Sequence, residues 1–284
     1  MRSKILLLAI VFFVLPNTAT AQDSKEAFLQ VLYGKAGLEE QVLQLPMVVQ
    51  VGFDQAVATD DRLKAMPRTV IGEIRASIET VFAPENIKRA ILSECREKLS
   101  IDDLKKVLAW LDSPLGRKFT QLEEAASTPE KYTEMQQFAQ MLQESSPLPE
   151  RLEIIGRLDE AAKATETSVE VAMNTQLAIT IAIVASLPKE QQPTYDNLAA
   201  VVEQTRPQIE SAMRAQTIVS LLYTYRNVTE TELDQYIEFA SYPTGKNYHD
   251  AAVSGLKKAL LEGSYAWGKA IADILTYATN TTEV

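Results

Sequence analysis

The chain has 284 residues and a formal net charge of −10 at pH 7. Strong negative charge argues against binding to nucleic acid or to anionic membrane surfaces, because both would repel it. One histidine and one cysteine are too few for a Cys/His zinc site, and a single cysteine cannot form an internal disulfide. No metal site is therefore expected.

Residues 1–21 have the three parts of a secretory signal peptide. A basic start carries Arg2 and Lys4, an apolar run follows, and Ala19-Thr20-Ala21 suits signal peptidase. The apolar run is shorter than the about 20 residues that cross a bilayer. We predict cleavage before Gln22, which changes the net charge from −10 to −12 through loss of the two basic residues. The alternative is an uncleaved N-terminal membrane anchor; no later segment is expected to cross a membrane.

The mature chain is predicted to be all-α. Apolar residues recur at spacings of three and four, long alternating patterns are absent, and proline with polar clusters marks the breaks. A joint at residues 144–149 divides the chain near its middle. We predict two helical repeats of about six helices each, at residues 22–145 and 146–278, packed about a pseudo-twofold axis, and a disordered tail at 279–284.

Cys95 lies in a predicted helix of the first repeat. It shares an apolar stripe with Ile91 and Leu92, which is typical of a small buried hydrophobe. We expect packing rather than thiol chemistry from Cys95.

Two stretches of the chain have similar sequences at an offset of 129 residues, which aligns Pro114 with Pro243 and Gly116 with Gly245. In each copy, Ser100 or Thr229 precedes an apolar helix, with an acidic residue three positions later, which is a capping pattern. Proline then ends that helix and begins the next one. The predicted core residues of this region are Leu104, Leu108, Leu111, Phe119, Leu233, Ile237 and Phe239.

The stretch therefore predicts a helix–Pro–helix corner that is used twice. In the first copy Ser113 can cap the second helix through its hydroxyl. The two glycines, in the first turn of that helix, leave room for another backbone or an aromatic ring to approach closely. The residues of the two corners are Ser113, Pro114, Gly116 and Arg117, then Pro243, Gly245 and Lys246.

This corner resembles the signature of domain-of-unknown-function family 2059. Residues 112–118 match it well, and residues 241–246 match it less well because the serine is displaced by one position. The resemblance implies two copies of a helical domain exported to the periplasm of Gram-negative bacteria. It implies no catalytic residues.

Motifs for the large enzyme classes are weak or absent. The sequence has no phosphate-binding glycine loop, so no nucleotide cofactor is expected. Ser254 and Lys257 match the S-x-x-K pattern of serine–lysine acylases, but the supporting K-T-G is missing. His249, beside Asp250, is expected to be a solvated surface residue rather than part of a triad. No catalytic residue is predicted.

Several charged and aromatic residues could have either a structural or a functional role. Acidic pairs, which include Glu123-Glu124, are expected on solvated faces or as helix-cap acids, although a hydrolytic carboxylate pair stays possible. Arg117, Lys118 and Lys246 are weak candidates for an anion site at a helix start, with pairing to an internal carboxylate or plain solvent exposure as the simpler reading. For four tyrosines of the second repeat core packing is expected, rather than a ligand site: Tyr223, Tyr225, Tyr236 and Tyr248.

Three functions are compatible with these patterns. The first is a non-enzymatic periplasmic module that binds a protein or an apolar partner in a groove between its halves. The second is an envelope hydrolase that uses a carboxylate pair or Ser254 with Lys257. The third is a structural dimerisation module. An apolar cleft without convergent ionisable groups would favour the first function, and two acids or Ser254 with Lys257 meeting in a cleft would favour the second.

Overall fold

The computed structural model describes residues 21–128, 131–145, 147–185, 187 and 189–282, and within them the fold is all-α, without strands. The predicted signal peptide lies almost entirely outside these residues. Before the predicted joint the helices are α1 (Ala21–Lys35), α2 (Leu38–Thr59), α3 (Asp61–Lys64), α4 (Arg68–Val81), α5 (Pro84–Lys98), α6 (Ile101–Asp112), α7 (Pro114–Ala126) and α8 (Lys131–Glu144).

After the joint the helices are α9 (Pro149–Ala162), α10 (Ala164–Ala185), the short 3₁₀ helix η1 (Lys189–Gln191), α11 (Tyr195–Glu203), α12 (Arg206–Thr224), α13 (Glu230–Ser241) and α14 (Pro243–Thr282). Helix α14 includes residues 279–282, where a disordered tail was predicted; residues 283–284 lie outside the described part.

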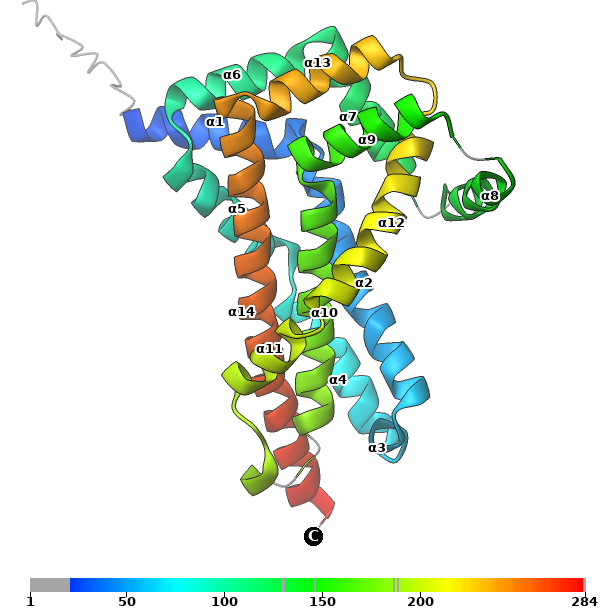
Figure 1. The fold of residues 1–284 in the computed structure, drawn as a ribbon. Coiled ribbons are helices and arrows are strands. Elements are labelled where there is room, and N and C mark those ends of the chain that lie inside the picture. Colours follow the sequence, from blue (N-terminus) through cyan, green and yellow to red (C-terminus); the bar gives the residue numbers. More distant parts are fainter. Residues whose placement is uncertain (1–20, 129–130, 146, 186, 188, 283–284) are drawn as a thin grey trace, which may run out of the picture.

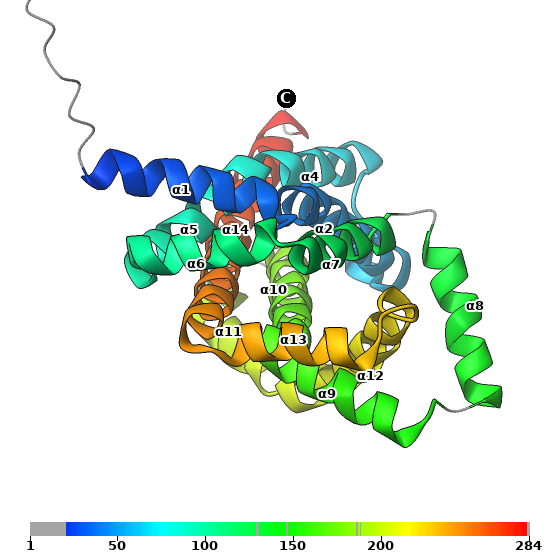
Figure 2. The ribbon, with the colours of Figure 1, turned by 90° about the horizontal axis from the view of Figure 1, so that it is seen from above.

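The long helices α10 and α14 lie side by side through the body of the molecule, with α5 along α14 (Figure 1). Helix α14 also contacts α4, and α10 contacts α2. Helices α6 and α13, which carry the two corner stretches, lie across one end, as the view from above shows (Figure 2). Helix α8 stands away from the body and touches it through α12.

The largest apolar core contains residues from both sides of the joint. It combines buried residues of α1 to α6 with Ala178 and Ala182 of α10 and Trp267 and Ile271 of α14. Cys95 is in this core with no exposed surface, as predicted, and burial raises the pKa of its thiol to about 12. The predicted division at residues 145/146 is thus crossed by the packing of α10 and α14.

Helix α10 is apolar on nearly every side, which is typical of a helix surrounded by protein. By length and composition alone it could cross a membrane, contrary to the expectation for the mature chain. Val169, Met173 and Leu177 of this helix are buried against α11, α12 and α14, and its Ala178 and Ala182 belong to the core that includes α2.

Both predicted helix–Pro–helix corners form, and both begin with a capping box. The Ser100 hydroxyl accepts from the Asp103 N–H while the Asp103 carboxylate accepts from the Ser100 N–H, and Thr229 and Glu232 repeat this exchange. Helices α7 and α14 then start at Pro114 and Pro243. At the first corner the Ser113 hydroxyl accepts a hydrogen bond from the Gly116 N–H at 2.9 Å, as predicted.

The two corner glycines occupy matching environments. A Cβ atom added at Gly116 would lie 2.0 Å from the Trp110 carbonyl oxygen, and one at Gly245 would lie 2.0 Å from the Phe239 carbonyl oxygen. The close approach predicted from the sequence is therefore to the last turn of the preceding helix. Four of the predicted core residues are buried (Leu104, Leu108, Phe119 and Leu233), and the other three are partly buried (Leu111, Ile237 and Phe239).

Candidate functional site

A cavity of about 460 Å³ lies between the two halves of the chain, behind the corners. Its wall takes residues from α2, α6 and α7 on one side and from α9, α10, α12, α13 and α14 on the other. Most of these residues are apolar or aromatic. Pockets of this size hold small organic molecules and use a few polar groups to orient them.

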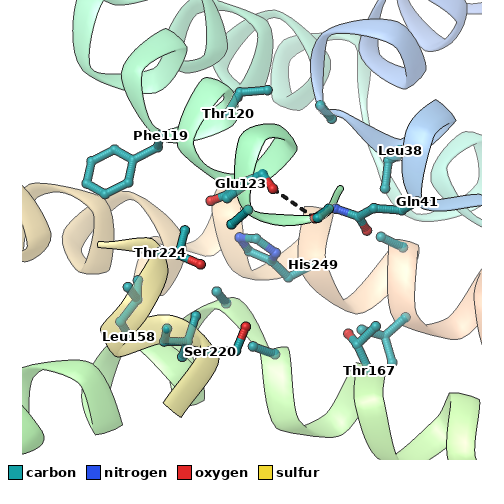
Figure 3. Close-up of a pocket in the computed structure, with 18 of the residues that line it drawn as sticks. Leu38, Gln41, Phe119, Thr120, Glu123, Leu158, Thr167, Ser220, Thr224 and His249 are labelled. Carbon is teal, nitrogen blue, oxygen red and sulfur yellow. Dashed lines mark hydrogen bonds between the residues drawn. The ribbon is translucent and has the colours of Figure 1, made fainter. Parts of the chain in front are cut away.

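Glu123 of α7 and His249 of α14 both bring ionisable groups to this wall (Figure 3). Among the described wall residues Glu123 is the only carboxylate, and no lysine or arginine takes part. The cavity is therefore apolar with one acidic and one imidazole group, rather than a cleft with two acids.

The Glu123 carboxylate is held by two tyrosines. The Tyr225 hydroxyl donates to Oε1 at 2.6 Å, and the Tyr236 hydroxyl also donates to this carboxylate. Burial raises the pKa of Glu123, the two hydroxyls oppose this shift, and the nearby charge of Glu124 adds to it. The residue keeps some accessible surface. A solvated face or a cap role was predicted for Glu123, and that prediction is wrong.

His249 was expected at the surface, and this prediction is also wrong. Its Nε2 atom is shielded from solvent and has no hydrogen-bond partner among the residues that the structure describes. Burial lowers the pKa of His249 to about 4, while Asp250 raises it and Lys163 lowers it further. The imidazole is therefore neutral near pH 7, and a buried polar atom without a partner costs about 1–3 kcal/mol.

The helical periodicity of the sequence indicates that both residues face inward, although their ionisable side chains suggest a surface position. His249 shares a helical stripe with Val253 and Leu256, at spacings of four and seven, and all three line the cavity. Glu123 follows the buried Phe119 at a spacing of four. Residues at these spacings lie on one face of a helix, so periodicity places both side chains on inward faces.

The four tyrosines contribute to packing and to hydrogen bonds. Tyr225 and Tyr236 pack against Phe119 with ring centroids 5.4 and 4.6 Å apart, and Tyr248 is buried beside the cavity. Tyr223 donates to Glu134 of α8 at 2.7 Å. The expected core packing is correct, and hydrogen bonds to two acidic residues accompany it.

The candidate anion-site residues do not converge. Lys118 pairs with Glu232 at 2.6 Å, and Lys246 pairs with Asp250 at 2.7 Å. Arg117 is exposed. The simpler reading, in which internal carboxylates take these cations, is correct for both lysines.

Ser254 and Lys257 point to different acidic residues. The Ser254 hydroxyl donates to Glu94 at 3.0 Å, and the Lys257 ammonium lies 3.2 Å from Glu170. A serine–lysine acylase needs the amine next to the hydroxyl to remove its proton. This geometry gives the S-x-x-K match no catalytic support.

The stability of the protein should depend on the protonation of His249. Its folded pKa of about 4 is below the value of about 6.5 for an exposed histidine. On acidification the unfolded state therefore binds the proton first. The contribution of neutral His249 to the free energy of unfolding is complete above pH 6.5, and it is lost as the pH falls toward 4. Between pH 7.5 and pH 4.5 this loss should be about 2–3 kcal/mol.

Urea unfolding of the wild type and of His249→Gln at several pH values measures this effect. The variant lacks the titrating group, so the wild-type stability should fall more steeply on acidification. The difference between the two proteins removes the contributions of Glu123 and other carboxyl groups. Parallel stability curves would show that His249 is not buried as described.

Comparison with known proteins gives one match. Residues 87–145 match domain-of-unknown-function family 2059, described as an uncharacterized protein conserved in bacteria. No curated protein and no solved structure matches the chain. The match begins in α5 and ends after α8, so it includes the first corner and Glu123. It is a single copy rather than the two that were predicted, and the second corner lies outside it.

Proposed function

We propose that this chain is a non-enzymatic binding protein that holds an apolar ligand in the cavity between its halves. The supporting observation is the cavity wall, which is built from both halves and contains mostly apolar side chains. Because apolar surface that meets a ligand leaves water, each buried Å² favours binding by about 25 cal/mol before the costs of association. The few polar groups then orient the ligand.

The absence of paired catalytic groups on the described wall supports binding over hydrolysis. Glycoside hydrolysis commonly needs two carboxyl groups across the scissile bond, whereas Glu123 is the only carboxylate among the described wall residues. Ser254 and Lys257 have separate acidic partners. An envelope hydrolase is therefore the weaker candidate.

We further propose that the protein works after export, in the periplasm of a Gram-negative cell. The signal-peptide pattern of residues 1–21 supports this, together with the family resemblance of the first half. Cleavage before Gln22 would leave nearly all of α1 in the mature protein.

A duplicated ancestor explains how the cavity arose, and we include it in the proposal. Trp110 and Phe239, which correspond at the offset of 129 residues, stack on each other with centroids 4.6 Å apart. Each capping acid also reaches across to the other corner: Asp103 accepts from Thr244 at 3.0 Å, and Glu232 pairs with Lys118. Such exchanged contacts are what a pseudo-twofold arrangement produces, with the cavity between the two copies.

A neutral apolar dye tests the binding function. N-phenyl-1-naphthylamine should bind the full mature chain saturably, at one site, with a rise in fluorescence. Ala252→Phe puts a large side chain on the cavity wall and should weaken binding by at least about tenfold, because it fills the space of the ligand.

The matched control is Ala58→Phe, which makes the same change at an exposed position of α2. It should leave dye affinity unchanged. Absence of saturable binding to the wild type, or equal loss in the two variants, would contradict a ligand site in this cavity.

A further inference from the structure

We propose that the ligand carries one organic cation, an alkylammonium group, and that this group lies against Glu123 with its apolar body along the cavity. This inference rests on the proposed binding function and specifies the chemical class of the ligand. Three properties of the wall support it: its charge, its hydrogen-bond acceptors and its aromatic rings.

The charge of the wall favours a cation. Glu123 can bring one negative charge into a mostly apolar space, and no described lysine or arginine on the wall balances it. A buried charge is costly unless an opposite charge pairs with it. A ligand carboxylate or phosphate would meet no counter-charge here, whereas an ammonium group would pair with Glu123. The net charge of the whole chain, −10, also attracts cations.

The polar atoms near Glu123 can accept the ammonium hydrogens. Tyr225 and Tyr236 donate to the carboxylate, which leaves some of its roughly four lone-pair positions free. The imidazole of His249 is on the same wall, but its Nε2 atom is covered by protein, so the carboxylate is the main acceptor. Hydroxyl groups of Ser220 and Thr224 lie around the same space (Figure 3). An ammonium group has three hydrogens to donate, so this set suits it.

Aromatic rings complete the environment of the cation. The wall includes Trp110, Phe119, Tyr225, Tyr236 and Tyr248. The negative face of an aromatic ring attracts a cation by about 0.5–2 kcal/mol, more strongly where water is excluded. The same rings give an apolar surface for the hydrocarbon part of the ligand.

Binding of the cation should release protons at pH values where free Glu123 is partly protonated. Burial raises the pKa of free Glu123, and a paired ammonium would favour the ionised form and lower that pKa. The titratable groups near Glu123 are Tyr225, Tyr236, Tyr248 and Glu124, with His249 on the same wall and Glu40 in a small neighbouring hollow that Glu123 also lines. Burial raises the pKa of the three tyrosines and lowers that of His249 to about 4, so these four groups do not titrate between pH 6 and 8.

Three probes with the same chain and different head charge test the inference by isothermal titration calorimetry on the full mature chain. Octylammonium should bind at least about tenfold more tightly than 1-octanol, and octanoate should bind most weakly, as charge pairing in a dry site predicts. Titrations in buffers of different ionisation enthalpy, repeated at decreasing pH, should show a release of protons with octylammonium alone, which grows as free Glu123 becomes protonated.

Glu123→Gln should abolish both the advantage of octylammonium and the proton release. The neighbouring Glu124→Gln, which removes an acidic group that is not on the cavity wall, should retain the advantage of octylammonium, with a smaller proton release because the charge of Glu124 raises the pKa of Glu123. Circular dichroism checks that the variants are folded, and the three-probe comparison on the unaltered protein decides the inference even if Glu123→Gln does not fold.

The outcomes separate the two proposals. Equal affinity for all three probes, or tightest binding of octanol or octanoate, overturns the cationic ligand and leaves the apolar binding function intact. Failure of all three probes together with failure of the neutral dye overturns both. Equal loss in Glu123→Gln and Glu124→Gln would assign the preference to general surface charge and would also overturn the inference.

Discussion

Replacing Trp267 with alanine is expected to lower the free energy of unfolding by about 3–5 kcal/mol, as for other fully buried tryptophans. Trp267 of α14 has no exposed surface and packs edge-on against Phe53 and Phe82, with centroids 5.4 and 6.3 Å away. Its Nε1–H lies 3.0 Å from the Ser77 hydroxyl and 3.3 Å from the Ile74 carbonyl. The substitution leaves a cavity at the contact between α14 and the first half, while the Ile74 carbonyl keeps its hydrogen bond from the Ser77 hydroxyl.

Urea unfolding followed by circular dichroism measures this loss. Tyr242→Ala is a suitable control because this aromatic residue is 59% exposed, so its removal should change stability by no more than about 0.5 kcal/mol. Equal midpoints for the wild type and Trp267→Ala would mean that α14 does not complete the core of the first half.

Gly116→Ala and Gly245→Ala are each expected to lower the free energy of unfolding by about 1–3 kcal/mol, through overpacking. In both cases the new Cβ would meet a backbone carbonyl oxygen at 2.0 Å, and a carbonyl at the end of a helix cannot move aside as a side chain can. The better helix propensity of alanine, about 1 kcal/mol, offsets only part of this cost. Matching environments predict similar losses at the two corners.

Gly72→Ala is the matched control for both variants. Gly72 is an exposed residue inside α4, and a Cβ there meets nothing within 4 Å. This change should raise stability by up to about 1 kcal/mol, the opposite sign from the corner variants. A corner variant that unfolds like the wild type would show that the chain can open the corner at little cost.

The apolar contact between α14 and α5 shows one limit of sequence reasoning. Gly255 lies where the backbones cross, since an added Cβ would be 2.4 Å from the Ile91 Cα atom. A single glycine in a helical pattern does not indicate which helix packs against it, because the contacting residue is about 160 residues away in the chain. Long-range contacts of this kind follow from the packing of whole helices.

The sequence by itself determined the local structure of this protein: an all-α chain, capping boxes at Ser100 and Thr229, two proline corners with crowded glycines and a buried Cys95. These features depend on neighbours within a few residues, through backbone hydrogen bonds and the helical period. Helical periodicity indicates that Glu123 and His249 are on inward faces, but only the tertiary structure decided that both line one cavity. Their burial depends on the packing of helices that are far apart in the sequence. From the sequence alone, a titratable residue is expected at the surface, because the helices that cover it are not known.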